Sequence, residues 1–116
     1  MLPKYHKIQE LLNDAQKEAL YEKLIAQLNK DFALANIEET FAASISPESL
    51  KRELHGIVFQ LIQEKFSEYL NLLYIIDVSE AKIKALDGSD MVQLSEQVAF
   101  LILKREWQKV WFKNKL

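Results

Sequence analysis

Side chains that could perform acid–base or metal chemistry are few in this chain of 116 residues, whose only histidines are His6 and His55. His6 and Glu10 have a helical spacing that could hold a metal ion, but two ligands are too few and a surface salt bridge explains the pair. His55 borders an apolar stripe and has no carboxylate three or four residues away, which favours a packed histidine over a general base. We therefore predict no catalytic residue, no metal site and no cofactor.

Motifs for nucleotide binding and nucleophilic catalysis are missing from the sequence. Two glycines are too few for a P-loop or a GxGxxG turn, and no GxSxG or HExxH pattern occurs. The chain has no cysteine, which excludes disulfides, thiolate metal sites and a cysteine nucleophile. A group of acids lacks the spacing of an EF-hand loop and is better explained as helix caps and turn formers: Asp77, Glu80, Asp87 and Asp90.

The last segment, "KREWQKVWFKNKL", combines aromatic and basic residues and carries five bases and one acid over residues 98–116, a net charge of +4. Trp107 and Trp111 are four residues apart and share one helix face, which predicts the end of a core helix with its lysines in solvent. Phe112 falls away from that face. Trp107, Trp111, Phe112, Lys109 and Lys113 are therefore candidates for a partner-binding surface.

The same C-terminal residues could stack on single-stranded nucleic acid or lie at a membrane surface. A local charge of +4 on a chain of net charge −2 is small for nucleic-acid binding, and we expect neither nucleic acid nor a membrane as the partner. A further alternative is an enzyme or ligand-binding bundle whose pocket comes from separate helices. Its candidate residues are His55, Tyr69, Tyr74 and Glu106, polar groups near apolar faces.

Composition favours long helices with few turns, because the chain has only two glycines and two prolines, with 49 % hydrophobic and 28 % charged residues. We predict an all-α bundle of four to five helices forming a single helical domain over residues 1–116. Apolar spacing places helices near 4–12, 14–36 and 47–76, a short one within 77–90, and the last over 90–114. The two long helices, 47–76 and 90–114, are expected side by side at the centre.

Helix starts are marked by capping residues. In "SPESL", Ser46 can cap, Pro47 suits the first position and Glu48 meets the positive end of the helix dipole. Asn13 is expected to start the second helix, Ser79 or Asp77 the short one, and Ser89 or Asp90 the last. Gly56, inside a predicted helix, indicates either tolerated exposure or a close crossing by another helix.

The runs "YLNLLYII" and "VAFLIL" could also be buried strands, but each continues a helical stripe. As helices they are apolar nearly all round, so we expect them at the centre of the core with neighbours on both sides. They are too short to span a bilayer, and the start does not resemble a signal peptide, so we expect a cytoplasmic protein. The functional expectation is a non-catalytic protein–protein interaction or self-associating module, such as a homodimer, with apolar surface that a small bundle leaves uncovered.

Overall fold

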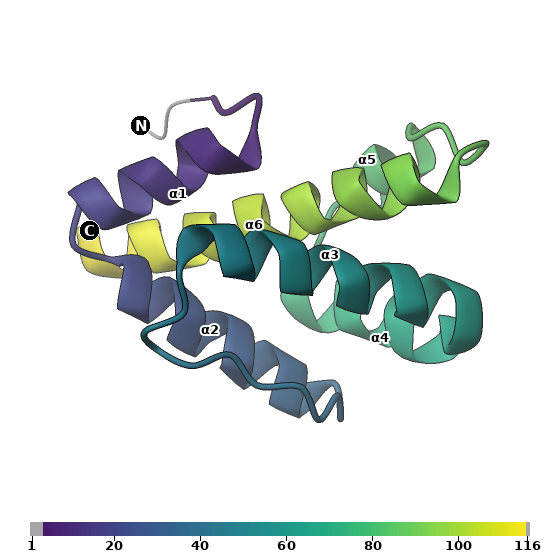
Figure 1. Ribbon diagram of the computed structural model, residues 1–116, viewed down its shortest axis with the longest axis horizontal. Helices are drawn as coiled ribbons and strands as arrows, with labels where there is room; N and C mark the ends of the chain where they lie inside the picture. The colour runs from purple at the N-terminus through teal and green to yellow at the C-terminus, as the bar shows by residue number, and fades with distance from the viewer. Residues whose placement is uncertain (1–3, 116) are drawn as a thin grey trace.

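Residues 4–115 are described by the computed structural model, and within this range the chain folds into six α-helices without a strand (Figure 1). The helices are α1 (Ile8–Lys17), α2 (Tyr21–Leu34), α3 (Pro47–Glu64), α4 (Phe66–Ile76), α5 (Glu80–Lys84) and α6 (Met91–Lys115). The all-α class is confirmed, and the strand alternative is wrong because both apolar runs are helical. The number of helices exceeds the expected four to five.

The middle of the bundle is formed by α3 and α6, which run side by side and make the most extensive contact between any two helices (Figure 1). Both bury aliphatic side chains completely, among them Leu54 and Val58 of α3 and Val98 and Ile102 of α6. Helix α6, with 25 residues, also contacts α1, α2 and α4. The central pairing of these two regions agrees with the expectation from the sequence.

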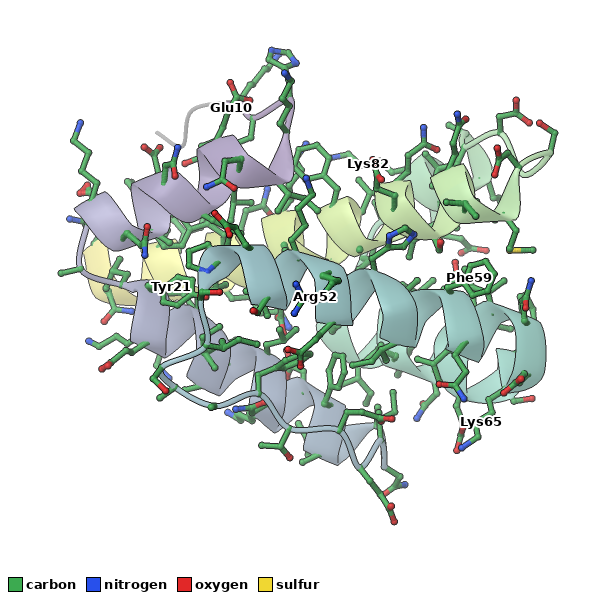
Figure 2. The ribbon with its side chains drawn as sticks, viewed as in Figure 1. Glu10, Tyr21, Arg52, Phe59, Lys65 and Lys82 are labelled. Atoms are coloured by element: carbon green, nitrogen blue, oxygen red, sulfur yellow. The ribbon has the colours of Figure 1, made fainter. Side chains whose placement is uncertain are left out.

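The predicted single helix over 47–76 is wrong, because the chain turns at Lys65 between α3 and α4 (Figure 2). Lys65 has φ −139° and ψ 58°, outside the helical region, while its N–H still donates to the Leu61 carbonyl. The turn lets α4 pack against α3. A straight helix would have carried Leu72 and Ile76, both fully buried, past the end of the core.

The break between the first two helices also differs from the expectation at Asn13, which lies inside α1. Ala19 adopts a left-handed φ of 58°, and the Leu20 N–H donates to the Ala15 carbonyl at 2.9 Å. The left-handed residue ends α1 and redirects the chain, so that two apolar stripes on opposite helix faces can meet one core.

Three predicted caps are confirmed. Ser46 Oγ accepts from the Ser49 N–H at 3.1 Å, and Ser79 Oγ accepts from the Lys82 N–H at 3.3 Å. At the start of α6, Asp90 Oδ1 accepts from the N–H groups of residues 92 and 93. Gly56 is exposed, and a Cβ added there would meet nothing within 4 Å. Gly56 therefore reflects tolerated exposure and not a helix crossing.

Candidate functional site

The C-terminal aromatic residues lie in different environments. Trp107 is 1 % exposed, and its Nε1–H donates to Tyr5 Oη at 3.0 Å, while the Tyr5 hydroxyl donates to Asp14 Oδ2 at 2.8 Å. Burial and the bond to Asp14 raise the pKa of Tyr5 to about 12. Trp107 is therefore a core residue that connects α6 with the start of the chain. Trp111 is half-buried and packs edge-to-face on Phe112, which is 46 % exposed.

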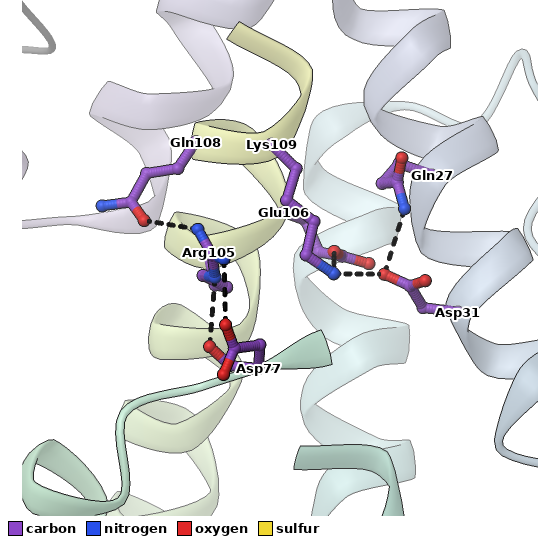
Figure 3. Close-up of polar contacts among 7 residues, drawn as sticks. All are labelled: Gln27, Asp31, Asp77, Arg105, Glu106, Gln108 and Lys109. Atoms are coloured by element: carbon purple, nitrogen blue, oxygen red, sulfur yellow. Dashed lines mark hydrogen bonds and ion pairs between the residues drawn. The ribbon is translucent and has the colours of Figure 1, made fainter. Parts of the chain in front are cut away.

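The basic residues of this segment also divide. Lys113 is exposed, as expected. Lys109 points inward, which corrects the expectation that the lysines lie in solvent. Its Nζ lies 2.8 Å from Asp31 Oδ2 on α2 and 3.1 Å from Glu106 Oε1 on its own helix (Figure 3). Gln27 Nε2 donates to the same Asp31 oxygen at 3.2 Å. We call Gln27, Asp31, Glu106 and Lys109 the buried cluster.

The carboxyl groups of the buried cluster are removed from water, with Asp31 3 % and Glu106 0 % exposed. Burial, together with the neighbouring Asp31, raises the pKa of Glu106 to about 9, against the opposing effect of Lys109. Burial alone would raise the pKa of Asp31, but interactions with Glu106, Lys109 and Gln27 outweigh it and leave that pKa below its usual value. At neutral pH, Glu106 thus keeps its proton, and Lys109 neutralises the single charge on Asp31.

The buried cluster holds a proton inside the protein, but it offers no access to a substrate. Both Glu106 oxygens are fully covered, and within residues 4–115 neither has a well-aligned hydrogen bond, although Lys109 is at ion-pair distance. General acid–base catalysis requires contact with the reacting group. The arrangement instead joins α2 to α6. Residues 4–115 contain no group of three or more His, Cys, Asp or Glu side chains that could hold a metal ion.

The four pocket candidates lie in separate places and line no common cavity. His55 is half-buried between α3 and α6, with Nε2 2.8 Å from Ser95 Oγ. Tyr69 is buried, which raises its pKa, and its ring packs on Phe66. Tyr74 is 81 % exposed on α4, while Glu106 belongs to the buried cluster.

The other unusual region lies on the outside of α4. Phe66, Leu70 and Tyr74, four residues apart along one helix face, are 53 %, 50 % and 81 % exposed. Beside them, a hollow of about 530 Å³ lies between α4 and α5, and its lining includes Leu73, Val78 and Ile83. These six residues form what we call the α4–α5 surface.

Charge is missing from the exposed face of α4. Its exposed residues are Phe66, Ser67, Leu70, Asn71 and Tyr74. The helix has one charged residue, the half-buried Glu68, whereas the exposed side of α3 carries Lys51, Arg52 and Glu53. Charged residues at the edge of the hollow, Asp77, Glu80 and Lys84, lie beyond the end of α4.

The α4–α5 surface shows that α4 is not covered on all sides, and it agrees with the expectation of uncovered apolar surface. The sequence predicts the apolar run 69–76 at the centre of the core with neighbours on both sides, but one face of α4 is open to solvent. The run 98–103 of α6 is covered, with four of its six residues buried and two half-buried. The bundle therefore leaves apolar surface uncovered, as expected from the sequence. Within residues 4–115, three of the six exposed large apolar side chains lie on α4 and one, Phe112, lies near the end of α6.

No protein-family model, curated protein or solved structure matches this chain. Across residues 4–115, no helix combines the length and the apolar character that crossing a membrane requires.

Proposed function

We propose that this protein is a non-catalytic protein–protein interaction module that binds a helix through the α4–α5 surface. The supporting observation is the exposed ridge of Phe66, Leu70 and Tyr74 on a helix face without charge. Interface cores are depleted in charged residues and enriched in tyrosine and phenylalanine. Exposed apolar residues that occur singly are ordinary, but a contiguous group beside a hollow is typical of a binding site.

The shape and chemistry of this surface suit an amphipathic helix. The ridge repeats every four residues, which is the spacing of one helix face. A hollow of about 530 Å³ runs beside it and could receive apolar side chains of a second helix packed along α4. The bound helix should present an uncharged apolar stripe, because a charge placed against the ridge of Phe66, Leu70 and Tyr74 would lose water and gain no partner on that uncharged helix face.

Photo-crosslinking in cells that express the chain tests this proposal. Tyr74 is replaced by p-benzoylphenylalanine, and the same probe at Phe112 reports on the rival aromatic site while one at Arg52 reports on an exposed polar face. We expect a discrete adduct from position 74 that disappears when Leu70→Asp is added. The peptide attached to it, mapped by mass spectrometry, should carry apolar residues at helical spacing.

The controls decide between the two aromatic regions. An adduct from position 112 with none from position 74 would move the interface to the C-terminal helix and contradict the proposal. Equal labelling from positions 74 and 52 would also contradict it, because the contact would then not depend on the apolar ridge.

A further inference from the structure

We infer that the helix bound by the α4–α5 surface is α4 of a second copy of this chain, packed antiparallel about a twofold axis near Leu70. This inference depends on the proposed function and names its partner. A twofold dimer requires one patch that complements itself, because both copies use the same residues. The α4–α5 surface meets this requirement, since a ridge and a hollow lie side by side on it.

The register follows from the positions of the ridge residues. Leu70 lies midway between Phe66 and Tyr74, so an antiparallel pair centred there places the two Leu70 side chains together. Phe66 of each copy then lies opposite Tyr74 of the other. The ridge covers about 12 Å of helix at 1.5 Å per residue, so three side-chain contacts extend along the whole pair. Each ridge also lies beside the hollow of the other copy.

Charge and composition favour a second copy over an unlike partner. An uncharged stripe is complemented by another uncharged stripe, and α4 carries one. Among the described residues, six large apolar side chains are exposed, and three of them form this ridge. The other three, Leu34, Val92 and Phe112, come from different parts of α2 and α6. Within residues 4–115, α4 is therefore the one helix with a stripe of the kind that the surface should bind.

The size of the surface predicts a weak dimer. At their exposed fractions, Phe66, Leu70 and Tyr74 offer on the order of 300–400 Å² per copy. With the lining of the hollow, two copies would bury on the order of 1,000 Å² in total, at the low end for specific interfaces. The dimer should therefore dissociate on dilution, with a dissociation constant of about 10–100 µM.

Sedimentation equilibrium at about 1 µM and about 500 µM, on either side of that range, tests the inference. The mass of the native chain should rise from 13.6 kDa toward twice that value. Tyr74→Lys should weaken dimerisation at least about tenfold, and it should not disturb the fold because this ring is 81 % exposed. Phe112→Lys and Val92→Asp, at residues 46 % and 55 % exposed, should leave the dimer intact. Circular dichroism checks that every variant is folded.

The absence of cysteine from the native sequence allows a test of the register. In a mixture of Phe66→Cys and Tyr74→Cys chains, a short bis-maleimide should join unlike chains faster than like ones. Leu70→Cys should form a linked dimer by itself, and Val92→Cys should not. Preferential linkage of like chains at positions 66 and 74 would contradict the antiparallel arrangement.

Two results would overturn the inference. A native chain that remains monomeric at about 500 µM excludes the second copy as the bound helix, and so does a dimer abolished by Phe112→Lys but not by Tyr74→Lys. If the chain is monomeric while position 74 still crosslinks to a different polypeptide, the inference fails and the proposed function stands. If position 74 also gives no adduct, both fail.

Discussion

The buried cluster and the α4–α5 surface break the usual distribution of polar and apolar residues in opposite directions. In the cluster, two ionisable residues are buried: Asp31 of α2 and Glu106 of α6. On the surface, Phe66, Leu70 and Tyr74 are apolar or aromatic residues open to water. Both arrangements cost free energy in an isolated chain, by loss of hydration in one and by exposure of apolar area in the other.

The two regions differ in how far contacts within the same chain compensate this cost in free energy. In the buried cluster, Lys109 and Gln27 contact Asp31, and Glu106 keeps its proton, so the group is close to neutral. On the α4–α5 surface, the described part of the chain leaves 53 % of Phe66, 50 % of Leu70 and 81 % of Tyr74 exposed. An unusual residue indicates a partner only where it is both open to solvent and left without compensation by its own fold; Glu106 is 0 % exposed and fails the first condition. We therefore interpret the cluster as structural and the surface as an interface.

Substitution of Trp107 in the interior of α6 should destabilise the fold more than any other change considered. Trp107→Ala should lower the free energy of unfolding by about 3–5 kcal/mol, because a fully buried ring leaves a cavity, and because the bond to Tyr5 is lost. Since a small domain is stable by about 5–15 kcal/mol in total, the variant should be near unfolding. Urea denaturation followed by circular dichroism measures this change. A loss below about 1 kcal/mol would mean that α6 is not the central helix.

Loss of the ion pair between Lys109 and Asp31 should lower the free energy of unfolding by the next largest amount. Lys109→Met removes the cation beside Asp31 and should cost about 3 kcal/mol, because a buried carboxylate loses its partner. Lys113→Met is the matched control on the exposed side of the same helix and should change the free energy of unfolding by no more than about 0.5 kcal/mol. Equal effects in urea denaturation would show that Lys109 is solvated.

Glu106 predicts a dependence of stability on pH. Its pKa rises from 4.5 to about 9 on folding, so the unfolded chain releases a proton in that interval that the folded chain retains. The contribution of Glu106 therefore favours folding at low pH and is lost as pH rises. Glu106→Gln removes this loss and should make the protein more stable by about 3–4 kcal/mol at pH 7, an order-of-magnitude figure from about 1.4 kcal/mol per unit between 4.5 and pH 7.

Asp31 has the opposite effect on stability, and this effect appears at acidic pH. Its lowered pKa contributes stability above the pKa of the unfolded aspartate, and this contribution is lost as pH falls through the folded value. Denaturation curves of the native chain should therefore show greatest stability at mildly acidic pH. In the Glu106→Gln variant, stability should no longer decrease toward alkaline pH but should still decrease toward acidic pH. Identical pH profiles for the two proteins would place Glu106 in contact with water.

Substitutions on the exposed ridge of α4 should have the smallest effect on the free energy of unfolding. Tyr74→Lys should change the free energy of unfolding of the dilute monomer by about 0.5 kcal/mol or less, since the ring is 81 % exposed and makes little contact within the chain. Thermal unfolding at about 5 µM, below the range proposed for the dimer, measures this value. A loss of more than about 2 kcal/mol would show that the ring packs in the core.

Local signals in the sequence predicted much of this fold. The caps at Ser46, Ser79 and Asp90 were found because each depends on a side chain and nearby amides. The turn at Lys65 was missed because the apolar spacing continues across it, without glycine or proline to mark the end of a helix. The break at Ala19 was missed because alanine rarely adopts a left-handed φ.

The buried cluster and the α4–α5 surface were predictable only in part, because both depend on how distant segments pack together. Glu106 was noticed as a polar residue near an apolar face, but Asp31 lies 75 positions earlier and only the fold brings them together. Its position between Leu28 and Phe32 in an apolar stripe was the available signal. For α4, the all-round apolar character was recognised, but it could not show which face the rest of the chain would leave open.

NMR spectra of the native chain at two concentrations observe the buried cluster and the α4–α5 surface in one experiment. Two-dimensional amide spectra of isotope-labelled protein at about 500 µM and about 10 µM, chosen to span the proposed dissociation constant, should differ at residues 66–84. Amides around Asp31 and Glu106 should not shift. Shifts that centre on residues 107–113, or spectra that are identical at both concentrations, would contradict the assignment of the α4–α5 surface as the self-association interface.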